Sequence, residues 1–232
     1  MGLLDGKVCL VTGASRGIGF ATVKRFAQEG ATVYANARTS GVIDDFCAEL
    51  SEKYNSSVQP VYFDVRDEAE AKKAIIRIRK ETGRLDVLVN NAGIMKDALI
   101  GMISRDLMQE IYETNVFGVM NMIQLASKVM MFQKSGSIIN LSSIVGLEGN
   151  PGQLVYSATK GAVTAMTKTA AKELAAQGIR VNAVAPGMID TDMFRSIGDE
   201  KLNAPLLCIF RRVYRAPRIV SVKMKQICRI ER

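Results

Sequence analysis

Short apolar segments alternate with longer amphipathic segments along most of the chain, and this alternation limits the folds that the chain can adopt. Strand-like apolar segments cover 7–13, 31–37, 57–65, 85–93, 136–143 and 178–187. Helix-like segments cover 18–30, 44–54, 69–83, 105–133 and 154–177. Strands that are apolar along their length and separated by helices form a parallel sheet buried on both faces. We therefore predict a single α/β domain with three layers, in which a doubly wound parallel sheet lies between helices. Pro60 favours an edge position for the third strand.

The composition is that of a globular protein. The chain has 232 residues, of which 48% are apolar and 23% are charged. No segment has the roughly 20 apolar residues of a membrane-spanning helix, and the first residues do not resemble a signal peptide. The four cysteines, Cys9, Cys47, Cys208 and Cys228, share no metal-ligand spacing. We therefore expect free thiols in a reducing cytoplasm, with no metal site and no membrane partner.

Residues 204–232 differ in composition from the rest of the chain. They contain eight Lys or Arg and a single acid, Glu231, so nearly all of the formal net charge of +8 lies there. They contain no glycine, although the chain has 19. We predict a domain over 1–203 and a divergent basic tail over 204–232, which is disordered or results from a shifted reading frame. A nucleic-acid-binding arm is the alternative, but the tail has no recognised motif, so we expect no nucleic-acid partner.

A glycine-rich turn, TGASRGIG at 12–19, joins the first predicted strand to the first predicted helix. Its glycines are Gly13, Gly17 and Gly19. Glycine lets the backbone approach a phosphate closely, and the N-terminus of the following helix carries a partial positive charge. The turn therefore predicts a dinucleotide site, with an ordinary strand–helix turn as the alternative.

Two arginines indicate which dinucleotide the turn would bind. An Asp or Glu about 20 residues past the glycines usually binds a free ribose 2′-hydroxyl. Here the second strand is followed by Arg38, and Arg16 lies within the turn. Guanidinium groups bind phosphate in bidentate fashion, which favours NADP(H) over NAD(H). The alternative is a pair of solvated surface arginines.

Four motifs occur in a characteristic order: TGASRGIG at 12–19, NNAG at 90–93, YSATK at 156–160 and PG at 186–187. With them the chain resembles the short-chain dehydrogenase/reductases from about Leu4 to about Asn203, and especially the bacterial 3-oxoacyl-[acyl-carrier-protein] reductases. The resemblance implies a Rossmann-type fold and a cytoplasmic, NADP-dependent oxidoreductase. It implies reduction of a 3-oxoacyl thioester in fatty acid biosynthesis, a part of lipid metabolism. It also implies a homodimer or homotetramer, whose assembly we expect the divergent tail to weaken.

The resemblance also implies the residues of the site. The catalytic tetrad would be Asn115, Ser143, Tyr156 and Lys160. Cofactor phosphates and ribose would lie against Gly13, Ser15, Arg16, Ile18 and Gly19, the adenine against Asp64 and Val65, and its ribose against Asn91, Ala92 and Gly93. The nicotinamide would lie against Pro186, Gly187, Ile189 and Thr191, together with Tyr156 and Lys160.

The chain contains no histidine, so an acid–base group for neutral pH has to come from another residue type. Tyr156 and Lys160 are four residues apart and share a face of their predicted helix. A nearby ammonium lowers the phenol pKa from its usual value of about 10, and a bound nicotinamide cation adds to this effect. Tyr156 is therefore the predicted proton donor. The alternative is an ordinary surface pair.

Ser143 and Asn115 would assist Tyr156. Ser143 ends the fifth predicted strand and could hydrogen-bond the substrate carbonyl, although Ser142 is an alternative and both serines could be strand-end caps. By resemblance, Asn115 would hold a water that relays protons through Lys160. The alternative for Asn115 is a local bond within its own helix.

The predicted reaction is hydride transfer from NADPH to a carbonyl carbon, with Tyr156 protonating the oxygen. Two other functions stay open. One is a member of the same family that acts on a sugar, a small alcohol or a steroid. The other is an inactive cofactor-binding protein, made so by its aberrant C-terminal segment.

Overall fold

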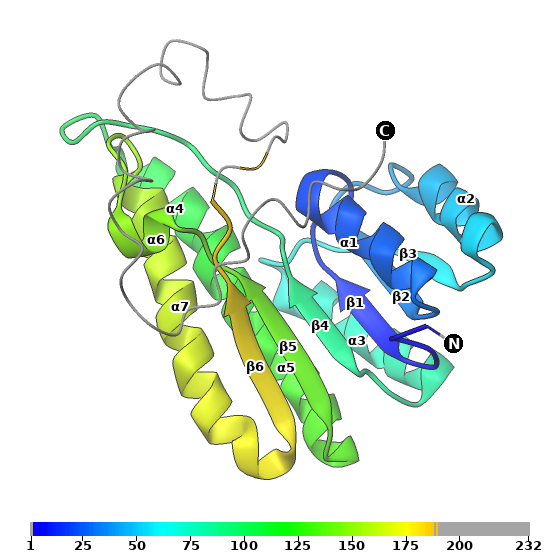
Figure 1. Ribbon diagram of the computed structural model, residues 1–232. Helices are drawn as coiled ribbons and strands as arrows, with labels where there is room; N and C mark the ends of the chain where they lie inside the picture. Colours follow the sequence, from blue (N-terminus) through cyan, green and yellow to red (C-terminus); the bar gives the residue numbers. More distant parts are fainter. Residues whose placement is uncertain (1, 188, 190–232) are drawn as a thin grey trace.

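The computed structural model describes residues 2–187 and residue 189 (Figure 1). The strands are β1 (Val8–Val11), β2 (Thr32–Ala37), β3 (Val58–Tyr62), β4 (Val87–Asn90), β5 (Gly136–Leu141) and β6 (Ile179–Val184). The helices are α1 (Gly17–Gln28), α2 (Asp44–Tyr54), α3 (Glu68–Thr82), α4 (Arg105–Tyr112), α5 (Gly118–Gln133), α6 (Val145–Glu148) and α7 (Leu154–Leu174). The predicted site residue Thr191 and the predicted tail lie outside the described residues.

The strands form one parallel sheet in the order β3-β2-β1-β4-β5-β6. In Figure 1 the strand arrows point toward the same end of the sheet. The predicted α/β fold with a doubly wound parallel sheet is confirmed. Pro60 lies in β3, which is an edge strand as the proline predicts. Among the described residues, β6 has a neighbouring strand on one side only.

Consecutive strand residues point to opposite faces of the sheet. Because these strands are apolar on both faces, a layer of helices packs on each face. Leu10 and Ile138 pack into a core with α3, α5 and the end of α7. Val11 and Val89 pack on the other face, with α1 and α2. Figure 1 shows α1 and α2 in front of the half of the sheet that contains β1 to β3, while α3 and α5 lie behind the sheet, α5 behind β5. The three predicted layers are therefore present.

The helices depart from the predicted pattern in two places. The segment predicted as one helix over 105–133 is divided by a π-helical turn (Glu113–Phe117), which lies between α4 and α5. The short helix α6 lies within the stretch between the fifth strand and the next helix, where no element was predicted. Among the described residues, no helix is both long and apolar enough to cross a membrane.

Cys9 and Cys47 are both free and buried. Burial raises the pKa of each thiol to about 12, so neither is a reactive thiolate at neutral pH. Cys208 and Cys228 lie outside the described residues. The location in a reducing cytoplasm stays a prediction.

The order of the strands determines where a ligand can bind. Chain order reverses between β1 and β4, which lie side by side, and β1 continues to β2 and β3 while β4 continues to β5 and β6. In open parallel sheets, ligands bind beyond the carboxyl ends of the strands at such a reversal. The predicted site segments at 12–19, 90–93, 142–143 and 185–187 follow β1, β4, β5 and β6 at this end.

Candidate active site

The glycine turn after β1 requires glycine for two different reasons. Gly13 and Gly17 have φ angles of +63° and +56°, in the left-handed region that favours glycine. At Gly19 the restriction is steric, because an added Cβ would lie 2.2 Å from the carbonyl oxygen of Gly13. The turn therefore folds tightly against the first turn of α1. Ser15 and Arg16 are exposed there, and Ile18 is half-buried.

Asn91 holds the glycine turn against the end of β4. Its Nδ2 donates to the carbonyl oxygens of Thr12 and Gly13, at 3.0 and 2.9 Å. In return, the Thr12 hydroxyl oxygen accepts from the backbone N–H groups of Asn91 and Ala92, at 3.0 and 3.1 Å. The side chain of Asn91 is thus occupied in shaping the turn. Sequence reasoning missed the role of Thr12, although it stands inside the quoted motif.

Asn36 is a second residue that sequence reasoning missed. It is buried in β2, and its backbone carbonyl accepts from Ala14 N–H at 2.7 Å. Its Nδ2 donates to the carbonyl oxygens of Val61 and Phe63, at 3.3 and 3.0 Å. It therefore joins the glycine turn to β2 and to the end of β3. The available signal was an amide in the otherwise apolar strand segment 31–37.

The predicted adenine contacts lie just after β3. Two nitrogens of the Arg66 guanidinium, Nε and Nη2, donate to Asp64 Oδ2 at 3.0 and 2.6 Å. This pair lowers the pKa of Asp64, and Arg38 adds a smaller electrostatic effect in the same direction. Val65 is buried, and it packs so closely on Gly118 that a Cβ there would lie 2.8 Å from its side chain.

Arg16 and Arg38 lie on neighbouring segments at the same end of the sheet. Arg16 is the N-cap residue of α1, and Arg38 directly follows β2, which pairs with β1. Both side chains are exposed. Their joint binding of a 2′-phosphate stays a prediction.

Ser143, Tyr156 and Lys160 come together where β5 ends beside α7. The Ser143 hydroxyl hydrogen-bonds the Tyr156 phenol. The Nζ of Lys160 lies 5.7 Å from the centre of the Tyr156 ring, and it donates to the carbonyl oxygen of Leu141 at 2.7 Å. The structure thus brings the three residues into one place, although they come from two separate elements.

The electrostatics of Tyr156 differ from the sequence-based expectation. Burial raises the pKa of Tyr156, the Ser143 hydrogen bond partly opposes this, and Lys160 has no resolved influence on it. The prediction that Lys160 lowers the phenol pKa is therefore wrong for the protein without its cofactor. The reason is that Lys160 is itself buried, with 6% of its surface exposed, and burial lowers its pKa to about 8.

Asn115 lies in the π-helical turn and is fully buried. Its Oδ1 accepts from Ile94 N–H at 2.8 Å, while its Nδ2 donates to Ile94 O at 2.9 Å and to the Thr159 hydroxyl at 3.2 Å. The alternative of a local bond within its own helix is therefore wrong. Asn115 instead joins the segment after β4 to α7. Such π-turns in helices often occur at functional sites.

Gly93 lies directly beside two of the predicted catalytic side chains. A Cβ at this position would lie 3.2 Å from Asn115 Oδ1 and 3.6 Å from Lys160 Nζ. Glycine therefore lets the chain after β4 pass close to both polar groups. The water between Asn115 and Lys160 stays a prediction.

Ser142 and Ser143 have different surroundings. The Ser142 hydroxyl is buried and donates to the carbonyl oxygen of Lys160 at 2.9 Å. Ser143 instead contacts Tyr156 and accepts a 3.4 Å bond from Val145 N–H. Only Ser143 therefore has its hydroxyl beside the phenol, which favours it over Ser142 as the residue that would contact substrate.

The segment after β6 lies beside Ser143. Ile144 N–H donates to Pro186 O at 3.0 Å, and Ser142 N–H donates to Val184 O at 2.8 Å. Pro186, Gly187 and Ile189 are all half-buried. The predicted nicotinamide segment therefore borders the predicted catalytic residues as far as it is described.

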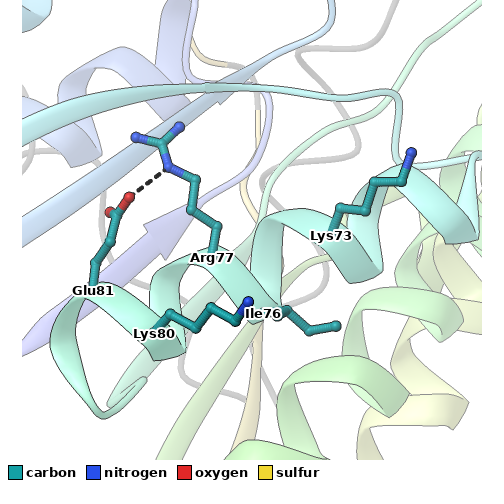
Figure 2. Close-up of a pocket in the computed structure, with 5 residues that line it drawn as sticks. All are labelled: Lys73, Ile76, Arg77, Lys80 and Glu81. Carbon is teal, nitrogen blue, oxygen red and sulfur yellow. Dashed lines mark hydrogen bonds and ion pairs between the residues drawn. The ribbon is translucent and has the colours of Figure 1, made fainter.

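A separate hollow on α3 is not part of this site. It is lined by Lys73, Ile76, Arg77, Lys80 and Glu81 (Figure 2). All five belong to one helix, and the Arg77–Glu81 ion pair forms one of its sides. The hollow is therefore a gap between long side chains of a single helix, away from the strand ends where the predicted residues meet.

A family model described as short chain dehydrogenase matches residues 7–202. The chain belongs to this family. The 3-oxoacyl-[acyl-carrier-protein] reductase of Thermotoga maritima is 46% identical over 88% of this chain and 82% of its own length. The enzyme of that name from Synechocystis is 43% identical over 87% of this chain and 82% of its own length.

Solved structures show the same fold. A gluconate 5-dehydrogenase from Burkholderia cenocepacia, in complex with NADP and tartrate, has a TM-score of 0.83 at 32% identity, over 89% of this chain and 80% of its own. An NAD⁺-bound xylitol dehydrogenase has a TM-score of 0.77 at 33% identity, over 80% of this chain and 71% of its own. The predicted family and Rossmann-type fold are confirmed.

The short-chain dehydrogenase fold implies a nicotinamide dinucleotide, and the glycine turn of this chain fits one. The left-handed glycines fold the turn tightly, and Ser15, Arg16 and Gly17 are exposed at the N-terminus of α1. Backbone N–H groups and the helix dipole at such a surface favour phosphate. Gly13, Ser15, Arg16, Ile18 and Gly19 are the residues that would hold the cofactor there.

The buried lysine predicts a pH-dependent stability of the cofactor-free protein. The pKa of Lys160 is about 8 in the folded chain and 10.5 ordinarily, so between these values the unfolded chain binds the extra proton. The contribution of Lys160 to the free energy of unfolding therefore rises with pH from 8 to 10.5, by about 3 kcal/mol in total. Below pH 8 this gain is absent.

Urea unfolding of Lys160→Met and of the parent protein, at several pH values across this interval, measures the effect. The free energy of unfolding of the parent should rise relative to that of Lys160→Met as the pH rises. Lys168→Met, at an exposed position on the same helix, is the matched control. A difference that is constant with pH for Lys160→Met contradicts the prediction.

Proposed function

We propose that this protein is an NADP-dependent oxidoreductase that reduces a 3-oxoacyl thioester, carried by an acyl-carrier protein, to the 3-hydroxyacyl product in fatty acid synthesis. One observation carries this proposal. The chain is 43–46% identical, over most of its length, to several enzymes named 3-oxoacyl-[acyl-carrier-protein] reductase. The contact of Ser143 with Tyr156 beside Lys160 supports a carbonyl reduction.

In this proposal the chain contributes orientation and proton transfer. When bound, the nicotinamide supplies the hydride that the carbonyl carbon accepts. Ser143 donates a hydrogen bond to the carbonyl oxygen, where negative charge develops, and Tyr156 gives that oxygen its phenolic proton. The products are a secondary alcohol and a Tyr156 phenolate, which recovers a proton by way of Lys160 and a water beside Asn115.

The pKa shifts agree with this direction of reaction. A raised pKa keeps the Tyr156 phenol protonated at neutral pH, so it is ready to donate. The phenolate left behind is unfavourable in a buried place and is reprotonated readily. Lys160, whose pKa is lowered to about 8, gives up a proton near neutral pH more easily than an ordinary lysine.

A sugar or polyol is the second candidate substrate. It is favoured by structural neighbours named gluconate 5-dehydrogenase and xylitol dehydrogenase. Their identities of 32–33% are lower than the 43–46% of the reductases, which supports the thioester as the first candidate. An inactive cofactor-binding protein is the third possibility.

Turnover tests separate these functions. We expect NADPH oxidation with acetoacetyl thioesters and little with sugars or polyols. Tyr156→Phe removes the proton donor and should lower kcat by about 10²–10⁴-fold while NADPH still binds. Tyr54→Phe is the control, because Tyr54 lies at the end of α2, where its hydroxyl accepts from Gln28. Turnover of sugars alone supports the second candidate, and NADPH binding without any turnover supports the third.

The cofactor preference is tested at Arg38. If Arg38 binds the 2′-phosphate, Arg38→Ala should raise the KM for NADPH by about 10- to 100-fold, since hydrogen bonds between charged groups contribute about 1.5–3 kcal/mol. The KM for NADH, which lacks this phosphate, should not change. Arg25→Ala, at an exposed position paired with Glu29, is the control. If Arg38→Ala raised the KM for NADH as much as the KM for NADPH, Arg38 would not bind the 2′-phosphate.

We also propose that two copies of the chain pair through α5. Phe117, Met120 and Met131 share one face of this helical stretch and remain 48%, 38% and 37% exposed. A row of apolar side chains along a helix is typical of an interface. A second copy is the simplest occupant, because one patch can meet its own image about a two-fold axis.

Charge substitutions test this pairing. Met120→Lys together with Met131→Lys should convert the dimer to monomers, because two lysines would lie against their copies at the interface. Sedimentation velocity measures the mass. Ile76→Lys, at a 44% exposed apolar position on α3, is the control. An unchanged mass for the double variant would rule out this face.

A further inference from the structure

Two side chains at the end of β5 bind α7, one from within the strand and one from the residue that follows it. Asn140 Nδ2 donates to the Thr167 hydroxyl at 2.9 Å, and one level nearer the strand end the Ser142 and Thr164 hydroxyls lie 2.8 Å apart. Asn140 and Ser142 are two residues apart on the strand and so point to the same side. Thr164 and Thr167 lie on the same face of the helix. The two contacts therefore fix how far along β5 the helix is placed.

The contact between Ser142 and Thr164 also includes the backbone of a catalytic residue. Lys160 O accepts from the Ser142 hydroxyl at 2.9 Å and from the Thr164 hydroxyl at 3.1 Å. On either side of Ser142, Leu141 O accepts from Lys160 Nζ, and the Ser143 hydroxyl bonds Tyr156. Leu141, the last residue of β5, and the two residues after it thus bind α7 within a single stretch of the helix, at residues 156–164.

The helix α6 also lies against this turn. A Cβ on Gly146 would lie 2.7 Å from both the Cβ and the carbonyl carbon of Lys160. The backbone of α6 therefore lies directly against Lys160. The contacts with α6 and with the Ser142 hydroxyl together leave the turn little room to move.

We propose that Ser142 and Thr164 are positioning residues, which hold the Lys160 turn of α7 against the end of β5 so that Ser143 and Tyr156 reach the same carbonyl oxygen. This inference rests on the proposed function. Both hydroxyls are engaged with each other and with Lys160 O. They affect the reaction through the distances of Ser143 and Tyr156 from the carbonyl oxygen. A misplacement of about 1 Å can lower a rate by about 100-fold.

The variants Ser142→Ala and Thr164→Val each remove one hydroxyl with little change of volume. Thr167→Val is the matched control, because it removes a hydroxyl from the same face of α7 that also binds a side chain of β5. Each variant is assayed for kcat, for the NADPH dissociation constant by fluorescence, and for thermal unfolding. Ultraviolet titration of Tyr156, taken as the difference from the same protein with Tyr156→Phe, is measured without cofactor.

We expect Ser142→Ala and Thr164→Val to lower kcat by about tenfold or more, with the NADPH dissociation constant within about twofold of the parent. The Tyr156 titration should move to higher pH, because its bond with Ser143 is loosened. Thr164→Ser, which retains the hydroxyl, should restore kcat. The double variant should be no worse than the poorer single variant, since the two hydroxyls act as one unit. Thr167→Val should lose stability but keep kcat and the titration of Tyr156.

The inference is overturned if Ser142→Ala and Thr164→Val lose stability as Thr167→Val does, with kcat and the Tyr156 titration unchanged. If Ser142→Ala does not fold, Thr164→Val and Thr164→Ser decide alone. If the parent protein reduces no thioester, the proposed function fails while the titration still tests the positioning. An unchanged titration in that case overturns the inference as well.

Discussion

The side chain of Lys160 is buried although it ends in an ionisable amine, and this burial determines which groups have to lie around it. An ammonium removed from water requires hydrogen-bond acceptors and a charge partner, or its pKa falls. Here the Nζ bonds the carbonyl oxygen of Leu141, and the pKa falls to about 8. The strand end must therefore stay beside α7, and Ser142 and Ser143, which follow Leu141 directly, are held against the same helix. Burial of one lysine thus goes together with the alignment of the predicted catalytic residues.

The glycine turn at 12–19, the predicted cofactor site, likewise depends on contacts with neighbouring segments. The glycine turn has its shape only because Asn91 binds two of its carbonyl oxygens and Asn36 accepts from the turn through its backbone. Asn91 directly follows β4 and Asn36 lies in β2, and these two strands lie on either side of β1. The order of strands in the sheet, more than the turn alone, therefore creates the surface that fits a pyrophosphate.

Much of this was predictable from the sequence, because strand–helix alternation and short motifs are local signals. The sheet, its two helical layers and the edge position of Pro60 followed from apolar periodicity and from the chemistry of proline. The π-turn at Asn115 was not predictable, since the apolar pattern around it is compatible with an unbroken helix. The resemblance already favoured Ser143 over Ser142, and the structure adds the surroundings that distinguish them: Ser143 contacts Tyr156, while the Ser142 hydroxyl bonds Lys160 O.

The pKa of Tyr156 shows where pairwise reasoning from sequence reaches its limit. Spacing placed an ammonium near the phenol and predicted a lower pKa, yet burial of both groups outweighs their attraction. A protonated phenol is the form that a reductase needs before the reaction. An oxidised nicotinamide bound beside Tyr156 would stabilise the phenolate that proton donation leaves. Without the cofactor, burial keeps Tyr156 protonated, which is the form that the proposed reduction requires.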